Sequence, residues 1–164
     1  MYRETDFEAI GKMDAVSLEE MSSVSLMNRI DTKFVTTVEK LRLVLEDAFQ
    51  AGYRVCEISG QRLMAYASVY YDTPDLQMYT AHRNGKKTRQ KVRVRTYLID
   101  DETFLEIKRK NNRGRTKKKR ISIPASSVMD FGAVPEASAF LEKKSWWKAS
   151  DLTPETTTDF CRFT

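Results

Sequence analysis

The sequence lacks the side chains from which most metal and nucleotide sites are built. It has two cysteines, Cys56 and Cys161, and one histidine, His82, with no CxxC motif or Cys/His cluster. This excludes an ordinary zinc site, so we expect both thiols to be small, buried side chains in a reducing compartment and His82 to be a surface or packing residue. The glycine-rich motifs GxxxxGK[ST] and GxGxxG are also absent, which excludes the usual phosphate-binding loops.

Long apolar runs are missing as well. No segment approaches the ~20 apolar residues of a membrane-spanning helix, and the amino terminus MYRETDFEAI has no apolar core of a secretory signal. We therefore expect a cytoplasmic protein. With 164 residues, of which 41% are hydrophobic, the chain is long enough to fold as one domain, 1–164, around a hydrophobic core.

Positive charge is concentrated in one part of the chain. Between Arg83 and Arg120 there are 16 Lys or Arg residues and 4 acidic residues, a balance of +12, whereas the remainder of the chain carries −7. A basic segment in a chain that is otherwise acidic indicates an anionic partner rather than a need for general solubility.

The basic part alternates as β-strands do. Segments 88–98, 103–110 and 116–123 are separated by short turns, so we predict an antiparallel meander. We expect its charges to stack on one face of the sheet: Arg89, Lys91, Arg93 and Arg95, then Glu106, Lys108 and Lys110, then Arg115, Lys117 and Lys119. The earlier segment 26–35 alternates too, with Arg29, Asp31 and Lys33 on one face.

The remaining segments predict helices and further strands. Apolar spacing indicates a helical segment over 7–26, a helix from Val38 to Gly52 after the cap Thr37, and a short helix over 74–85. Strands are expected over 53–58 and 66–73, and an amphipathic helical stretch after Pro124 precedes an extended tail. The fold class is therefore α+β, with an antiparallel sheet and flanking helices.

The charged faces need an explanation. Neighbours on one face of a strand are ~6.8 Å apart, and two cations at that distance repel by roughly 2 kcal/mol at an effective dielectric near 20. A solvated face would screen much of this repulsion, but natural solvated faces mix the two signs. We interpret the three strands as a surface that binds a polyanion.

Two acidic residues interrupt the cations. Glu106 and Asp31 each have two open interpretations: a salt-bridge partner that orients neighbouring cations, or an oxygen ligand of a divalent metal. Few aromatic residues are expected on the basic face, and single-stranded nucleic-acid binders usually place stacking platforms there. We therefore do not expect nucleic acid as the partner.

Four linked segments resemble the VTC domain, the polyphosphate-polymerase-like branch of the triphosphate tunnel metalloenzyme superfamily, which also includes the CYTH proteins. They are LMNRIDTKF, YYDTPDLQMYTAHRNGK, KVRVRTY and FLEIKRKNNRGRTKKKRI, in this order and spacing. The resemblance is strong over 16–120 and weak in the tail. It implies that the antiparallel sheet forms part or all of a tunnel that binds triphosphate, polyphosphate or ATP together with Mg²⁺ or Mn²⁺.

The resemblance also assigns roles to particular residues. It implies catalytic roles for Arg93, Arg95 and Lys108, and phosphate binding by Lys33, by Lys119 or Lys117, and by Arg162 of FCRFT. Arg29 and Lys91 join the phosphate-binding set from their places on the charged faces. Arginine can contact phosphate with two donors at once, and lysine supplies a point charge.

Three functions remain open at this point. The domain could extend polyphosphate from ATP, hydrolyse triphosphates, or bind polyphosphate or RNA without catalysis. The family's later strands have no counterpart before Thr164. We therefore expect the domain to be truncated at its C-terminal side, with a homo-oligomer or a second chain as a way to complete the barrel.

Overall fold

The computed structural model of the chain describes residues 2–22 and 32–164. It divides into two compact units, Met1–Met64 with Cys161–Thr164 and Ala65–Phe160. Within the expected N-terminal helical segment, α1 (Glu8–Lys12) and α2 (Leu18–Ser22) are separated by the short strand β1 (Ala15–Val16). Positions 23–26 of that segment lie outside the described residues.

The first unit contains α3 (Val38–Gln50), which begins where the sequence predicts it. The hydroxyl of Thr37 accepts a hydrogen bond from the Lys40 backbone N at 3.4 Å, which satisfies one free N–H of the first turn. The strand expected over 53–58 shortens to β2 (Val55–Cys56), which pairs in parallel with β1. A small core holds these elements together: Phe7, Ala9, Ile10, Met13, Leu45 and Val55.

The prediction of a strand over 26–35 is wrong for residues 32–35, which are the part of this segment that the structure describes. Residues 32–37 are exposed and have no regular secondary structure, and Lys33 lies among them. Arg29 and Asp31 lie outside the described residues. Alternation alone did not determine a strand here, because a strand also needs a partner for its backbone N–H and C=O groups.

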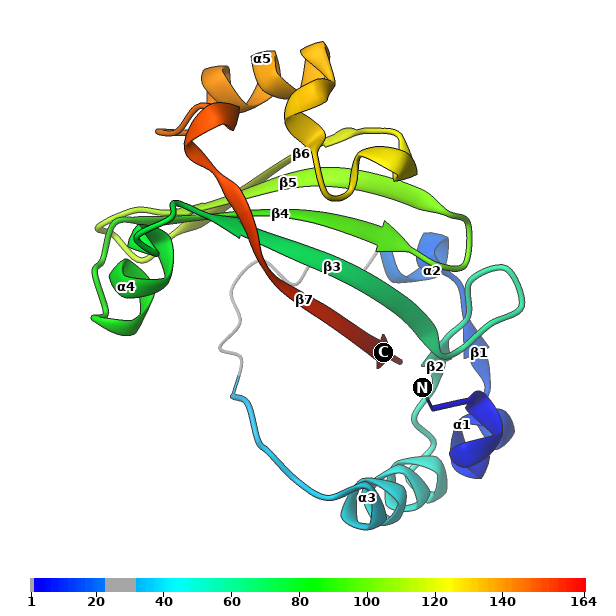
Figure 1. Cartoon of the computed structure of the whole chain (residues 1–164). Helices are drawn as coiled ribbons and strands as arrows, with labels where there is room; N and C mark the ends of the chain where they lie inside the picture. Colours follow the sequence, from blue (N-terminus) through cyan, green and yellow to red (C-terminus); the bar gives the residue numbers. More distant parts are fainter. Residues whose placement is uncertain (1, 23–31) are drawn as a thin grey trace. The chain divides into compact units, whose positions relative to one another are not determined.

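The second unit is built on a five-stranded antiparallel sheet, which confirms the α+β class (Figure 1). The strand order is β6-β5-β4-β3-β7. The strands are β3 (Met64–Asp72), β4 (Arg89–Tyr97), β5 (Glu102–Lys110), β6 (Thr116–Ser122) and β7 (Thr153–Arg162). Since β6 and β7 are the two edges, the sheet does not close into a barrel within residues 2–22 and 32–164.

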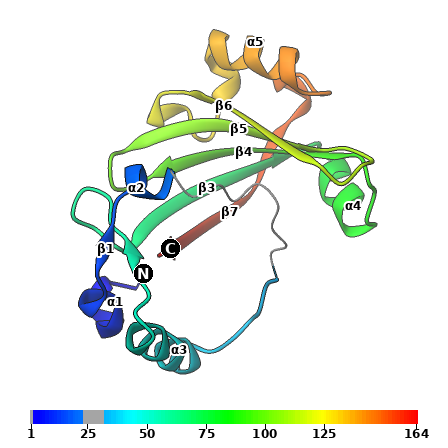
Figure 2. The ribbon, with the colours of Figure 1, turned by 180° about the vertical axis from the view of Figure 1, so that it is seen from behind.

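Helices connect the strands and cover one face. The predicted short helix is α4 (Gln77–Arg83), between β3 and β4. The amphipathic stretch after Pro124 forms α5 (Pro135–Lys144) with the 3-10 turns Ala125–Ser127, Phe131–Ala133 and Ala149–Asp151. Seen from either side, α5 lies against β5 and β6 (Figure 2). In the described parts of the chain, no helix is long and apolar enough to cross a membrane.

The covered face carries the hydrophobic core of this unit. Alternate residues of the three central strands are buried there, namely Val69, Val92, Val94, Leu105 and Ile107. They share the core with Phe131 of a 3-10 turn and with Ala137 and Leu141 of α5. Burying a side chain of this size contributes about 1.5–3 kcal/mol. The core therefore fixes which residues of each strand face away from it.

The register of β6 corrects the predicted charge pattern. Thr116 pairs with Lys110 and Lys118 with Lys108, so Lys118 and Arg120 lie on the face of Glu106 and Lys108. Lys117 and Lys119 lie on the opposite face. The reason is the turn, in which Asn111 Oδ1 accepts hydrogen bonds from the backbone N atoms of Arg113 at 3.1 Å and Arg115 at 3.0 Å. A register shift of one residue moves every side chain to the other face.

Candidate anion-binding site

We call the side of the sheet opposite the core the polar face. The antiparallel register places Arg93 opposite Glu106, Arg95 opposite Phe104 and Lys91 opposite Lys108. Directly opposed residues lie only about 4.5–5.5 Å apart, so these side chains form one continuous surface. Its members are Tyr66, Ser68, Tyr70, Lys91, Arg93, Arg95, Phe104, Glu106, Lys108, Lys118 and Arg120.

At the centre of the polar face lies an ion triad. Arg93 donates from Nε at 2.7 Å and approaches with Nη2 at 2.6 Å, both to Glu106 Oε2. Lys118 Nζ forms an ion pair with the other oxygen, Oε1. Glu106 is fully buried and Arg93 is 7% exposed. A buried carboxylate is stable here only because two cations compensate its loss of water.

The pKa values of Glu106 and Arg93 are both shifted in the triad. Burial acts to raise the pKa of Glu106, but the hydrogen bonds and charges of Lys118 and Arg93 outweigh it and lower that pKa. Burial acts to lower the pKa of Arg93, but its bonds to Glu106 and Tyr70 outweigh it and raise that pKa. Glu106 and Arg93 are therefore both ionised at neutral pH. These contacts match the interpretation of Glu106 as the residue that orients its neighbouring cations.

Arg95 has no carboxylate partner in the described part of the chain. Its Nε donates to Ser68 Oγ at 3.0 Å, and its guanidinium lies 5.2 Å from the Tyr66 ring centre and 5.0 Å from that of Phe160. Burial, followed by the charge of Arg93, lowers the pKa of Arg95. The aromatic rings hold the guanidinium in place, and its terminal N–H groups have no acidic partner in residues 2–22 and 32–164.

Lys108 is the second uncompensated cation. It is half-buried between Lys91 and Lys118 in the register and forms no ion pair within the two described ranges. Burial, followed by the charge of Arg93, lowers its pKa. An anion placed here would neutralise the mutual repulsion of Lys108, Arg95 and Arg93.

Aromatic side chains also line the polar face, contrary to the expectation from sequence. Tyr66 packs against Tyr97 at 5.1 Å and Phe160 at 5.2 Å between ring centres, and Tyr97 packs against Phe104 at 5.7 Å. The guanidinium of Arg120 lies 4.2 Å above the Phe104 ring centre. The same period-two alternation that picked out Arg95 also places Tyr97 and Phe104 on this face, whereas Tyr66 and Phe160 required the sheet order.

The structure does not bring all the predicted residues together. Arg93, Arg95, Lys108 and Lys91 share the polar face, and Lys118 replaces Lys117 and Lys119 there. Lys33 belongs to the first unit, as does Arg162, which is exposed at the end of β7. Lys118 was missed because every residue from Lys117 to Arg120 is cationic. The signal that could have found it is Ile121, which pairs with Leu105 and packs against the core, so that Lys118 falls on the opposite face.

Glu106 and Asp72, the two buried carboxylates of the sheet, do not fit a Mg²⁺ or Mn²⁺ site. Both oxygens of Glu106 are already engaged by cations, and those of Asp72 accept the backbone N–H groups of Met78 and Tyr79, each at 2.8 Å. No group of three His, Cys, Asp or Glu side chains gathers there as a metal site. The second predicted ligand, Asp31, lies outside these ranges, and no step below involves a metal ion.

Comparisons with known proteins place the chain in a family. No curated protein matches the sequence. A solved structure of a candidate adenylate cyclase from Vibrio parahaemolyticus is similar with 13% identity and a TM-score of 0.38, covering 62% of this chain and 45% of that chain, which is too distant to carry an argument. The VTC domain matches residues 28–162. The chain therefore belongs to the VTC domain family.

Proposed function

We propose that the polar face binds the phosphates of polyphosphate, tripolyphosphate or a nucleoside triphosphate. Membership of the VTC domain family supports triphosphate- or nucleotide-related binding. The observation that carries the proposal is the pair of half-buried cations Arg95 and Lys108, which surround a compensated triad and have no acidic partner of their own in residues 2–22 and 32–164. Such a pair costs stability unless an anion binds to it.

The contacts of the individual residues indicate the role that we propose for each of them. Lys91, Arg95 and Lys108 contact phosphate oxygens, while Arg93 is fixed by Glu106 and Tyr70 and adds charge and its remaining N–H groups. The family resemblance further proposes Lys33 and Arg162 as phosphate-binding residues, and the charge pattern of its segment proposes Arg29. Within a cell we place the protein in the cytoplasm.

We also propose that this face supports phosphoryl transfer from ATP to polyphosphate. Phosphoryl transfer depends mainly on positioning and charge stabilisation, which fixed cations supply. The attacking end of polyphosphate is already anionic, so a general base is not needed. Product analysis separates this reaction from its alternative: polymerisation releases ADP and lengthens the chain, whereas a triphosphatase releases phosphate.

Calorimetric titration at constant ionic strength tests binding directly. Tripolyphosphate should bind more tightly than sulfate, and Lys108→Met should weaken tripolyphosphate by about tenfold, equivalent to about 1.4 kcal/mol. Lys117→Met removes the same charge from the opposite face and should change affinity by less than about twofold. Equal binding of sulfate and tripolyphosphate, or equal losses in the two variants, would refute the proposal.

The aromatic cluster favours a second candidate, binding of single-stranded RNA. Tyr66, Tyr97, Phe104 and Phe160 combine ring faces with arginines, as sequence-tolerant RNA-binding surfaces do. Competition at fixed salt separates the two candidates. RNA that remains bound in excess tripolyphosphate would favour the RNA-binding function.

A further inference from the structure

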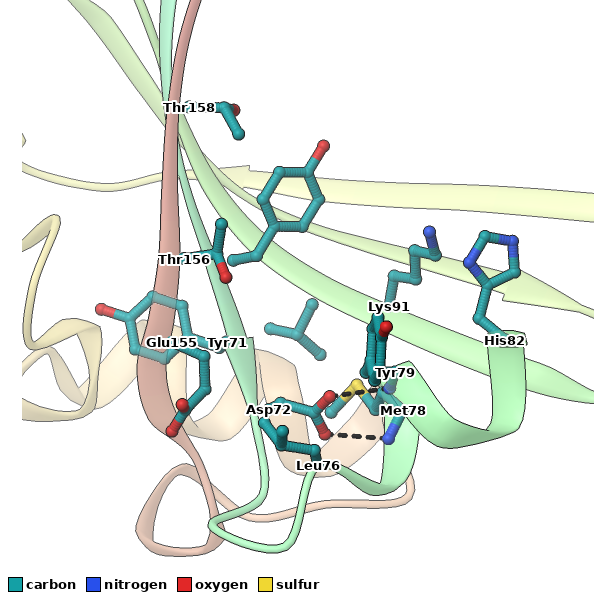
Figure 3. Close-up of a pocket in the computed structure, with 12 residues that line it drawn as sticks. Tyr71, Asp72, Leu76, Met78, Tyr79, His82, Lys91, Glu155, Thr156 and Thr158 are labelled. Atoms are coloured by element: carbon teal, nitrogen blue, oxygen red, sulfur yellow. Dashed lines mark hydrogen bonds between the residues drawn. The ribbon is translucent and has the colours of Figure 1, made fainter. Parts of the chain in front are cut away.

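A groove of about 460 Å³ lies at one end of the sheet in the second unit. Its lining comes from α4, from the start of β4, and from Trp146 and Trp147 in the segment after α5. None of its lining residues belongs to the polar face. It is separate from the cavity of about 400 Å³ in Figure 3, which is lined by residues of β3, β4, α4 and β7 and has Met78 in common with the groove.

Buried polar side chains hold two parts of the groove in place. Figure 3 shows the Asp72 carboxylate, which is buried and accepts two backbone N–H groups from the first turn of α4, each at 2.8 Å. The amide of Gln90, also buried, donates to Ser145 Oγ at 2.7 Å and accepts from the backbone N of Trp146 at 3.2 Å. The groove is therefore preformed, and a partner does not have to order it on binding.

Trp146 is the largest apolar group of the groove that water can reach. It is 45% exposed, and the guanidinium of Arg109 lies 4.6 Å from its ring centre. Met78 and Ala81 add apolar surface from α4. A tryptophan that is already held in position gains burial at little entropic cost when a partner covers it, and tryptophan is enriched among the residues that contribute most to protein–protein binding.

The charges of the groove are mainly positive. Lys86 and Arg89 line it, and neither forms an ion pair within residues 2–22 and 32–164. Arg89 donates from Nη1 to the backbone carbonyl of Lys86 at 2.8 Å, which leaves its other N–H groups for a partner. The acidic residue of the lining, Asp75, already accepts the Thr73 hydroxyl at 2.6 Å and the Gln77 amide at 2.9 Å. The groove therefore complements carboxylates.

We propose that this groove binds an acidic segment of a partner protein. One bulky apolar side chain of that segment lies on Trp146, and neighbouring Asp or Glu side chains pair with Lys86 and Arg89. A nucleic acid fits less well, because surfaces that bind its backbone use a continuous row of cations, and here the carboxylate of Asp75 interrupts them. The proposal does not depend on phosphate binding at the polar face.

Tryptophan fluorescence tests the proposal directly, because the chain has two tryptophans and both line the groove. The probe is a synthetic peptide of glutamates around one phenylalanine, titrated into the full chain at constant ionic strength. The peptide should change the tryptophan emission, and saturating tripolyphosphate should leave that change in place. A peptide with alanine instead of phenylalanine should bind about tenfold more weakly, since it leaves Trp146 uncovered.

Two adjacent lysines provide matched variants. Lys86 and Lys87 are both exposed, but Lys86 lines the groove and Lys87 does not. Calorimetry should show that Lys86→Gln weakens the peptide about threefold and that Lys87→Gln leaves its affinity close to that of wild type. Trp146→Ala should weaken it about tenfold, and a circular dichroism spectrum like that of wild type checks that this variant folds.

Several results would overturn the proposal. They are unchanged emission with the peptide, equal losses in the two lysine variants, and displacement of the peptide by tripolyphosphate. An emission change with oligouridylate RNA but not with the peptide would assign the groove to nucleic acid instead. Emission that changes with protein concentration alone would assign it to a second copy of the chain.

Discussion

The two faces of the same sheet are stabilised in opposite ways. Leu105 and Glu106 are neighbours on β5 and both are fully buried, but they point to opposite faces. Leu105 stabilises the fold by leaving water and packing against the core beneath α5. Glu106 loses favourable hydration when buried, and only Arg93 and Lys118 offset that cost. The core face therefore supports the fold by itself, whereas the polar face is held together by charges that an anion can also satisfy.

The largest expected loss of stability comes from a substitution at the centre of the polar face. Glu106→Gln leaves the buried Arg93 without a carboxylate and should lower the free energy of unfolding by about 3 kcal/mol, the typical cost of removing one partner of a buried pair. Leu105→Ala should lower it by a similar 2–5 kcal/mol or so, through the lost apolar contacts and the cavity left behind. Urea denaturation measures both losses.

Ligand rescue distinguishes the two losses. Tripolyphosphate should restore more stability to Glu106→Gln than to Leu105→Ala, because the anion replaces the missing charge beside Arg93 and Lys118. Equal stabilisation of both variants by tripolyphosphate would contradict the claim that the two faces are stabilised in different ways.

As the pH falls, the contribution of the polar face to the stability of the fold should decrease while that of the core face stays unchanged. The pKa of Glu106 is lowered in the folded state, so the triad's contribution is present above the ordinary glutamate pKa of about 4.3 and is lost as pH falls through the lower, folded value. The stability gap between wild type and Glu106→Gln should therefore narrow in that acidic range. Melting temperatures from pH 7 downward give the gap, and Leu105→Ala, which removes no titrating group, provides the control.

The sequence predicts the sheet better than it predicts the complete site. Alternation in β4 and β5 places Arg93, Arg95 and Lys108 correctly, because apolar residues on the opposite side mark the core face. In β6 the run of cations from Lys117 to Arg120 hides that alternation, because Ile121, which marks the core face, comes only near the end of the strand. The register also depends on the turn held by the Asn111 side chain. The cavity of about 400 Å³ that is lined by residues of β3, β4, α4 and β7 was not predicted from the sequence. These four segments are far apart in the chain, and only the folded sheet brings them together.

The smallest expected effect tests the register that separates the two faces. Lys118→Gln removes a cation from the polar face and should weaken tripolyphosphate binding about threefold to fivefold, less than a fully buried group would, because the Lys118 side chain is 39% exposed. Lys119→Gln removes the neighbouring charge, opposite Ile107 on the other face, and should change binding by less than twofold or so. Calorimetric titration at one ionic strength compares the affinities of the two variants for tripolyphosphate, and the two variants have the same net charge. If Lys119→Gln proves the more harmful, β6 pairs with β5 one residue out of the register described above, and the triad around Glu106 would need another lysine.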